Sequence, residues 1–316
     1  MDTRIARRDR QRLFTIAQFA TISYDGTAMN DVPRTVRIVE VGPRDGLQNE
    51  EAILPVEKKL EFIRLLGEAG LKDIEVGSFV HPKWIPQLAN SEEVIARLPR
   101  VPGIRYSALV PNMKGLDRAL ASGIERIAVF TAASETFNQK NINMGIAESL
   151  DVFRPVIGRA LREGLSVRSY ISTCFVCPYE GTIAKEKVAD VTHALLDLGV
   201  DEVSIGDTIG AATPVDVEST GGYLLSRFPS SKLAMHFHDT YGMAIANVFA
   251  SFRLGISVFD SSAGGIGGCP YAPGAAGNVS TEKLAYLFDR LGIVTGVTLD
   301  RLRVAARYIG NELRAS

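Results

Sequence analysis

Short β-branched and apolar runs alternate with longer segments of helical periodicity from about residue 35 onward. Apolar runs of about four to eight residues predict strands, whereas apolar residues three and four positions apart predict amphipathic helices. The strand pattern recurs in eight segments: 36–41, 72–79, 104–110, 126–132, 166–173, 201–208, 232–239 and 256–263. Strands that alternate with helices in this way are typical of a parallel sheet.

The segment VEKKLEFIRLLGEAG (56–70) illustrates the helical pattern. Leu60, Ile63 and Leu66 recur at helical spacing, and Gly70 stands where a helix would end. Eight strand–helix units in roughly 250 residues match a (β/α)8 TIM barrel. A doubly wound open sheet is the alternative, but no G-x-G-x-x-G fingerprint follows the first strand. The predicted fold is therefore an α/β TIM barrel that ends in a short C-terminal helical segment.

Residues 1–34 stand outside this alternation and are predicted to form an N-terminal extension, either an ordered arm or a flexible tail. The barrel domain is expected to occupy residues 35–316. The first dozen residues are rich in arginine, as in an organelle transit peptide, but Asp2 and Asp9 interrupt them and serine is absent there.

The composition is that of an ordinary globular protein, with 316 residues, 46% apolar content and 22% charged content. A net charge of -1 argues against a nucleic-acid or anionic-membrane partner, and the lack of any run of 18 apolar residues argues against a transmembrane helix. Three cysteines without a secretory signal indicate a reducing compartment. We predict a cytoplasmic location, with the mitochondrial matrix as the alternative.

The stretch HFHDTYGMAIAN (236–247) places two of the four histidines one residue apart at the end of a predicted strand. His236 and His238 should therefore point to the same side. Asp45 follows the first strand and Asn278 follows the eighth, and the C-terminal ends of barrel strands meet at one mouth. Two imidazoles, a carboxylate and an amide oxygen suit an octahedral Mg²⁺ or Mn²⁺ with two positions left for substrate oxygens, with zinc and Co²⁺ left open.

Other chemically capable residues fall at the same strand ends. Arg44 belongs either to this site or to an ordinary turn made by PRDG. Glu75 lies inside an apolar strand and needs a partner, for which Arg44 is predicted. Cys269 lies in a Gly- and Pro-rich loop, where a lone cysteine is more often a small buried residue. The CFVC pair, Cys174 and Cys177, is predicted to be structural.

Seven motifs occur in order along the chain: VGPRDGLQNE (41–50), IEVGSFVHPKWIPQ (74–87), ASETFNQKNIN (133–143), CPYEG (177–181), GDTIG (206–210), HFHDTYGMAIAN (236–247) and GGIGGCPYAPGAAGN (264–278). Together they resemble hydroxymethylglutaryl-CoA lyase, within the wider group of metal-dependent TIM-barrel lyases and synthases. The resemblance implies cleavage of 3-hydroxy-3-methylglutaryl-CoA, an acyl-CoA substrate, to acetoacetate and acetyl-CoA. It also implies a divalent cation, Mg²⁺ or Mn²⁺, and a homodimer.

The resemblance also implies roles for individual residues. The metal ligands would be Asp45, His236, His238 and Asn278, which agrees with the set reached from strand positions. The catalytic residues would be Arg44 to polarise the substrate, Glu75 to orient the site, Asp207 or His236 to accept the hydroxyl proton, and Cys269 to donate a proton. The substrate contacts would be Arg44, Gln48, Asn141, Tyr170 and Ser204. Cys174 stands one position away from the cysteine expected in the family, so no role is carried over to it.

Three alternatives remain at the level of sequence. A condensing synthase of the same barrel group shares the RDG and HxH motifs, but the GGCPYAPGAAGN loop favours the lyase. A lyase for a longer 3-hydroxyglutaryl-CoA homologue would share every motif. A barrel that binds CoA or metal without turnover would have no need of a proton donor such as Cys269.

Overall fold

The computed structural model describes residues 32–268 and 277–315. The chain divides after Val32, and the unit that begins at Pro33 carries the barrel. The prediction of an N-terminal extension over residues 1–34 falls almost entirely outside the described residues. Cys269 also lies outside the described residues.

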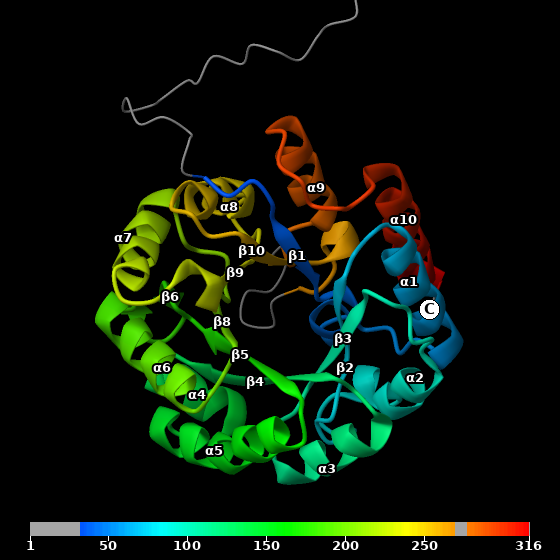
Figure 1. Cartoon of the computed structure of the whole chain (residues 1–316), viewed down its shortest axis with the longest axis horizontal. Helices are drawn as coiled ribbons and strands as arrows, with labels where there is room; N and C mark the ends of the chain where they lie inside the picture. Colours follow the sequence, from blue (N-terminus) through cyan, green and yellow to red (C-terminus); the bar gives the residue numbers. More distant parts are fainter. Residues whose placement is uncertain (1–31, 269–276, 316) are drawn as a thin grey trace, which may run out of the picture. The chain divides into compact units, whose positions relative to one another are not determined.

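Eight parallel strands form a closed barrel in the order β1-β10-β9-β8-β5-β4-β3-β2 (Figure 1). Their bounds are β1 Arg37–Glu40, β2 Asp73–Ser78, β3 Arg105–Leu109, β4 Arg126–Ala132, β5 Ser166–Ser172, β8 Glu202–Asp207, β9 Leu233–Phe237 and β10 Val258–Ser261. Each lies within one of the eight segments that the sequence predicts as strands. The predicted (β/α)8 barrel is therefore confirmed.

Helices surround these strands (Figure 1). Their bounds are α1 Val56–Glu68, α2 Ser91–Arg97, α3 Met113–Ser122, α4 Glu135–Ile142, α5 Ile146–Arg162, α6 Lys185–Asp197, α7 Pro214–Leu225, α8 Ala244–Arg253, α9 Thr281–Arg290 and α10 Leu299–Ala315. The predicted C-terminal helical segment is α10. It packs against α1, where Lys58 Nζ lies 3.0 Å from Glu312 Oε1, and so it takes part in the ring of helices.

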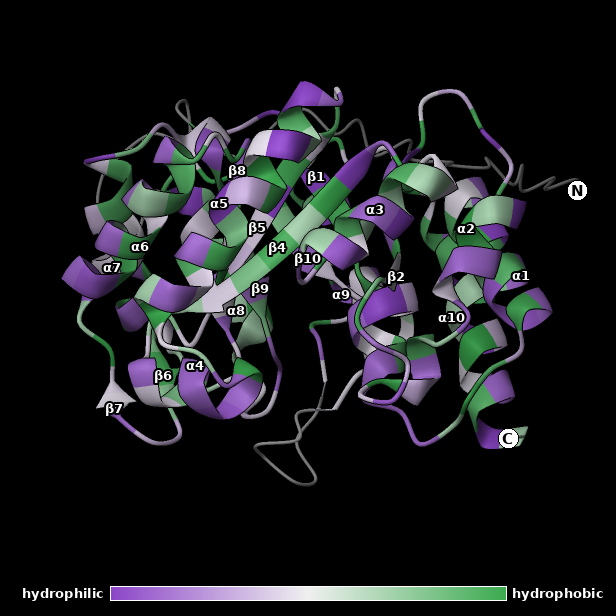
Figure 2. Ribbon diagram, turned by 90° about the horizontal axis from the view of Figure 1, so that it is seen from below, coloured by the Kyte–Doolittle hydropathy of each residue, from purple (hydrophilic) through white to green (hydrophobic). Residues whose placement is uncertain are grey.

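Helix α1 shows why the apolar pattern gives this architecture. Its buried residues include Phe62, Ile63 and Leu66, whereas Glu57, Arg64 and Glu68 are exposed, and Figure 2 shows both kinds of residue along α1. Burying one such side chain stabilises the fold by about 1.5–3 kcal/mol. Gly70 follows with a φ of 101°, and a Cβ atom there would lie 2.1 Å from the Gly296 carbonyl oxygen. Glycine is therefore required at this helix end, as the sequence predicts.

The connection after β5 contains a short antiparallel pair that the sequence analysis did not predict. Strands β6 (Val176–Cys177) and β7 (Gly181–Thr182) have two residues each, which is too short to show an apolar alternation. Cys174 and Cys177 are buried and free. Gly181 has a φ of 72°, which suits it to the turn.

The strands present apolar residues to the helices and several polar residues to the barrel interior. The Phe259 ring of β10 lies 5.6 Å from that of Phe288 in α9, and Phe288 also meets Phe252 of α8. The next residue of β10, Asp260, instead pairs with Arg168 of β5, a strand that is not its neighbour. A contact between two strands that are not neighbours must cross the barrel interior. This interior therefore contains buried charged side chains, whereas branched apolar residues dominate the interior of most TIM barrels.

Candidate metal centre and active site

Asp45, His236 and His238 bring three ligand atoms within 4.8 Å of one another. Nε2 of each histidine lies 3.9 Å from Asp45 Oδ2, and the two imidazole centroids are 5.2 Å apart. His236 lies in β9, His238 directly follows it, and Asp45 lies in a turn after β1. The HxH pair and the carboxylate therefore face one point.

Asn278 adds an oxygen to the same point. It forms an antiparallel bridge with His238, and its Nδ2 donates to Asp45 Oδ2 at 2.9 Å. Its Oδ1 is buried and has no hydrogen-bond partner among the described residues. A buried acceptor without a partner costs about 1–3 kcal/mol. A divalent cation at this point would satisfy it, so the residues present fit the predicted metal.

Arg44 joins Asp45 to Glu75, as the sequence predicts. Its Nη1 donates to Asp45 Oδ1 at 2.5 Å, and its Nε donates to Glu75 Oε1. Burial alone would raise the pKa of Asp45, but the Arg44 guanidinium and the two histidines hold that pKa well below its usual value. Asp45 is therefore an anion suited to bind a cation.

The turn that carries these two residues is a π-helical turn over Gly42–Gly46, not an ordinary β-turn. A Cβ atom at Gly42 would lie 2.5 Å from Glu40 Oε1, and one at Gly46 would lie 2.7 Å from Ile266 Cγ1. The close approach of these side chains to the backbone favours glycine at both positions. The GPRDG pattern thus reflects the packing of this turn as well as its chemistry.

Asp207 ends β8 at the same rim, as predicted, and it is fully buried. Its carboxylate accepts hydrogen bonds from the Ala211 and Ala212 amides at 3.0 and 3.1 Å. Burial raises its pKa to about 6, and these two amides and the nearby histidines limit the rise. A carboxyl group with a pKa near neutrality can both accept and return a proton.

The four further residues predicted to contact substrate differ in their surroundings. Gln48 has a buried Oε1 without a partner among the described residues. Tyr170 and Ser204 lie inside the barrel, where the Tyr170 hydroxyl donates to Glu75 and the Ser204 hydroxyl donates to Asp260 at 2.7 Å. Asn141 is exposed near the end of α4. Substrate contact by these four residues stays a prediction.

Asp260, which the sequence did not single out, lies beside His236, one of the predicted metal ligands. Its Oδ2 is 3.3 Å from His236 Nδ1, and Arg168 pairs with its other oxygen. Burial would raise the pKa of Asp260, but Arg168 and His236 hold it below its usual value. The signal was available, because Asp260 interrupts an apolar strand in the same way as Glu75.

A second set of charges lies where the strands begin. Asp73 pairs with Arg105 at 2.5 Å and lies 3.5 Å from Arg126. Glu202 pairs with Arg37 and lies 3.6 Å from Arg126. These residues begin β1, β2, β3, β4 and β8, so they lie at the N-terminal end of the barrel.

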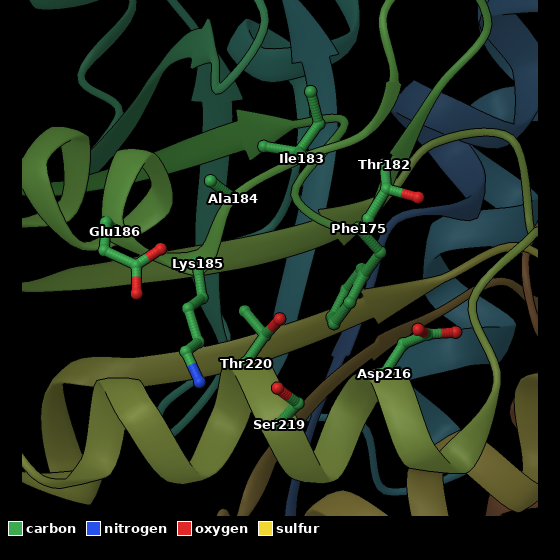
Figure 3. A pocket seen from close by; sticks show the side chains of 9 residues that line it. All are labelled: Phe175, Thr182, Ile183, Ala184, Lys185, Glu186, Asp216, Ser219 and Thr220. Carbon is green, nitrogen blue, oxygen red and sulfur yellow. The ribbon is translucent and has the colours of Figure 1, made fainter.

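A pocket of about 250 Å³ lies between the segment that joins β7 to α6 and helix α7 (Figure 3). The Phe175 ring and the Lys185 side chain both point toward α7, which contributes Asp216, Ser219 and Thr220. No residue of the predicted site lines this pocket. It is separate from the metal ligands.

Within residues 32–268 and 277–315, no helix has the length and apolar character that crossing a bilayer requires.

The family model HMGL-like matches residues 35–309. Hydroxymethylglutaryl-CoA lyase YngG of Bacillus subtilis is 48% identical over 281 residues, which cover 89% of this chain and 94% of the relative. The mitochondrial hydroxymethylglutaryl-CoA lyase of Bos taurus is 47% identical, with 95% and 91% covered.

Solved structures give the same picture. The hydroxymethylglutaryl-CoA lyase of Pseudomonas aeruginosa has a TM-score of 0.89 and 49% identity, with 90% of this chain and 95% of that chain covered. An HMG-CoA lyase of Acinetobacter baumannii in complex with coenzyme A and 3-methylmalate has a TM-score of 0.85 and 37% identity, with 91% and 93% covered. With the barrel, the ligand set and these relatives in agreement, the chain belongs to the HMGL-like family.

Proposed function

We propose that this protein is a metal-dependent carbon–carbon lyase that cleaves 3-hydroxy-3-methylglutaryl-CoA to acetoacetate and acetyl-CoA. The observation that supports this most strongly is the convergence of Asp45, His236, His238 and the unpartnered Asn278 Oδ1 on one point. The supporting likeness is identity of about 48% to a hydroxymethylglutaryl-CoA lyase over most of both chains. A similar lyase has been solved with coenzyme A bound.

The reaction breaks the bond between C2 and C3 of the acyl group. The tertiary hydroxyl on C3 must lose its proton so that C3 becomes a ketone, and C2 leaves as the enolate of acetyl-CoA. Both changes develop negative charge on oxygen. A divalent cation, Mg²⁺ or Mn²⁺, held by Asp45, His236, His238 and Asn278 would lower the pKa of that hydroxyl and orient it, a contribution of several kcal/mol.

Arg44 is proposed to stabilise the thioester oxygen as it becomes an enolate. Its guanidinium is always cationic, and two of its N–H groups are directed to Asp45 and Glu75. These two carboxylates fix the plane of the guanidinium, so that its outer N–H groups can meet a substrate oxygen. A donor held in place before the reaction lowers the barrier more than one that must reorient.

Asp207 is the better candidate to take the hydroxyl proton. His236 has Nδ1 beside Asp260 and Nε2 beside Asp45, so neither ring nitrogen is well placed to accept a proton from substrate. Asp207 has a pKa of about 6, and only two backbone amides and no basic side chain donate hydrogen bonds to it among the described residues. Gln48 and Asn141 are proposed to contact substrate, as are Tyr170 and Ser204.

Cys269 is proposed to protonate C2 of the enolate. Replacing Cys269 with Ala should lower turnover about 10²- to 10⁴-fold, the range for loss of a proton-transfer group. Mn²⁺ affinity should not change, because the thiol is not in the proposed ligand set. Unchanged turnover in this variant would remove Cys269 from the mechanism.

The test of the function is an acetoacetate-release assay with purified protein and Mg²⁺ or Mn²⁺, with and without EDTA. We expect release from 3-hydroxy-3-methylglutaryl-CoA that EDTA abolishes and added metal restores. Including longer 3-hydroxyglutaryl-CoA homologues, and running the reverse condensation, distinguishes a different lyase or a synthase. No release from any of these substrates would contradict the proposal.

We also propose that the enzyme is a cytoplasmic homodimer. Its relatives include the cytoplasmic 3-hydroxy-3-methylglutaryl-CoA lyase of Rattus norvegicus and mitochondrial lyases, so the mitochondrial matrix is the alternative compartment. Light scattering coupled to gel filtration would test the dimer, and fluorescent tagging would test the compartment.

A further inference from the structure

Arg168 lies inside the barrel and is not one of the proposed metal ligands. It belongs to β5 and is 1% exposed. Its Nε donates to Glu202 Oε1 at 2.7 Å, its Nη1 donates to the Tyr170 hydroxyl at 2.9 Å, and its Nη2 donates to Asp260 Oδ1. One guanidinium therefore has a separate partner for each of its three nitrogens.

The Asp260 branch leads to a metal ligand. Asp260 Oδ2 lies 3.3 Å from His236 Nδ1 and also accepts from the Ser204 hydroxyl. Residues Asp260 and His236 are register partners on the neighbouring strands β10 and β9. Because Arg168 is permanently cationic and donates to Asp260, the carboxylate is an acceptor at His236. His236 must then carry its proton on Nδ1. The lone pair of Nε2 is left free and is directed to the point where the proposed ligand atoms converge.

The Tyr170 branch leads to the substrate side of the same site. The Tyr170 hydroxyl accepts from Arg168 and donates to Glu75 Oε2, and Glu75 Oε1 accepts from Arg44. Arg44 in turn donates to Asp45, which lies 3.9 Å from His236 Nε2. Both branches thus return to the point where the ligand atoms meet.

We infer that Arg168 is a positioning residue that fixes the tautomer of His236 through Asp260 and the orientation of Arg44 through Tyr170 and Glu75. It touches neither the proposed cation nor the substrate. The inference rests on the proposed metal site and lyase activity. Partners of this kind outside the ligand set change metal affinity by about 10- to 100-fold when they are lost.

Arg126 provides a matched control in the same barrel. It is also a buried arginine, at 4% exposed, and it also lies near Glu202. Its carboxylate neighbours are Asp73 and Glu202, and among the described residues it forms no hydrogen bond or ion pair with Asp260, His236 or Tyr170. Arg126→Met therefore removes a buried guanidinium without touching either branch.

The experiment compares Arg168→Met, Arg168→Lys, Asp260→Asn and Arg126→Met. Mn²⁺ affinity is measured without substrate from the electron paramagnetic resonance signal of free Mn²⁺. The tautomer of His236 is read from a long-range ¹H–¹⁵N spectrum of the metal-free protein. Circular dichroism checks that each variant folds, and Arg168→Lys and Asp260→Asn supply the answer if Arg168→Met does not fold.

We expect the wild type and Arg126→Met to show the Nδ1-protonated tautomer and Mn²⁺ affinities within about twofold of each other. In the folded Arg168 and Asp260 variants, Mn²⁺ affinity should fall about 10- to 100-fold and the Nε2-protonated tautomer should appear. An unchanged tautomer together with unchanged Mn²⁺ affinity would overturn the inference. Since neither measurement uses substrate, its failure is distinct from a failure of the wild type to release acetoacetate.

Discussion

The two ends of one barrel both carry charged residues, but the charges are arranged differently. At the N-terminal end, the two buried carboxylates face arginines: Asp73 meets Arg105 and Arg126, and Glu202 meets Arg37 and Arg126. At the C-terminal end, four potential ligands face one another, and Asn278 Oδ1 has no partner among the described residues.

This difference separates a structural charge cluster from a functional one. A buried carboxylate that is matched by a guanidinium already has its counter-charge, so removing one partner costs stability. At the C-terminal end Asp45 also has a guanidinium, that of Arg44, but the ligand atoms converge on one point and the buried Asn278 Oδ1 has no partner among the described residues. Such an arrangement costs stability until a cation is present, and catalytic groups gather at this end of barrels. Substitutions at the C-terminal end should therefore lower activity more than stability. Substitutions at the N-terminal end should lower stability more than activity.

The largest effect is expected at the C-terminal end. Asp45→Ala removes the carboxylate ligand and should lower acetoacetate release by about 10³-fold or more, as expected for loss of electrostatic stabilisation. The melting temperature of the metal-free protein should change by only about 2 °C, because Arg44 keeps Glu75 as a partner. Steady-state kinetics and calorimetry check both values. Turnover above about a tenth of the wild-type value in this variant would contradict a functional role for the C-terminal cluster.

The opposite substitution is Asp73→Asn at the N-terminal end. It leaves Arg105 and Arg126 without their shared carboxylate and should reduce the free energy of unfolding by about 3 kcal/mol. Turnover per folded molecule and Mn²⁺ affinity should stay at the wild-type values, because these three residues lie at the opposite end of the barrel from the proposed metal ligands. Urea unfolding and kinetics at low temperature measure the two quantities. Lost turnover in the folded variant would show that the two ends are not separable.

A smaller effect concerns Glu40, the last residue of β1, at the C-terminal end of the barrel. Its carboxylate accepts from the Gly42 and Ala263 amides at 2.9 Å and from the Thr281 hydroxyl at 2.7 Å. It thereby holds the turn that carries Asp45 and the start of α9. Burial raises the pKa of Glu40 from 4.5 to about 7, despite these three hydrogen bonds.

A raised carboxyl pKa means that the folded state binds the proton more tightly than the unfolded state. The stabilising contribution is complete below pH 4.5 and is lost as the pH rises to about 7. Between pH 5 and 7.5, Glu40→Gln should gain about 2 kcal/mol of stability relative to the wild type, at about 1.4 kcal/mol per pKa unit. Urea titrations at several pH values give this difference. Parallel profiles for the two proteins would contradict it.

The fold was predictable because its signals are local. Each strand needs only a short apolar run, and Gly70 marks the end of α1 by its own conformational freedom. The β6–β7 pair was missed because two-residue strands carry no periodic signal. The close packing around Gly42 and Gly46 involves Glu40 and Ile266, and Ile266 is far away in sequence.

The site was predictable only in part. The HxH spacing and the strand-end positions of Asp45 and Asn278 led to the ligand set. The carboxylate of Asp260 and the guanidinium of Arg168 were missed because their roles depend on contacts across the barrel, between β5 and β10. Sequence spacing reports which residues share a strand, but it does not report which side chains meet across a closed sheet.

The most direct test of the metal site is Mn²⁺ bound to protein labelled with ¹⁵N at histidine. We expect one Mn²⁺ per chain and hyperfine coupling from two imidazole nitrogens, with one coupling lost in each of His236→Ala and His238→Ala. Asp45→Ala should lower the affinity for the same ion. Absence of nitrogen coupling, or couplings that survive in both histidine variants, would contradict a cation held by these residues.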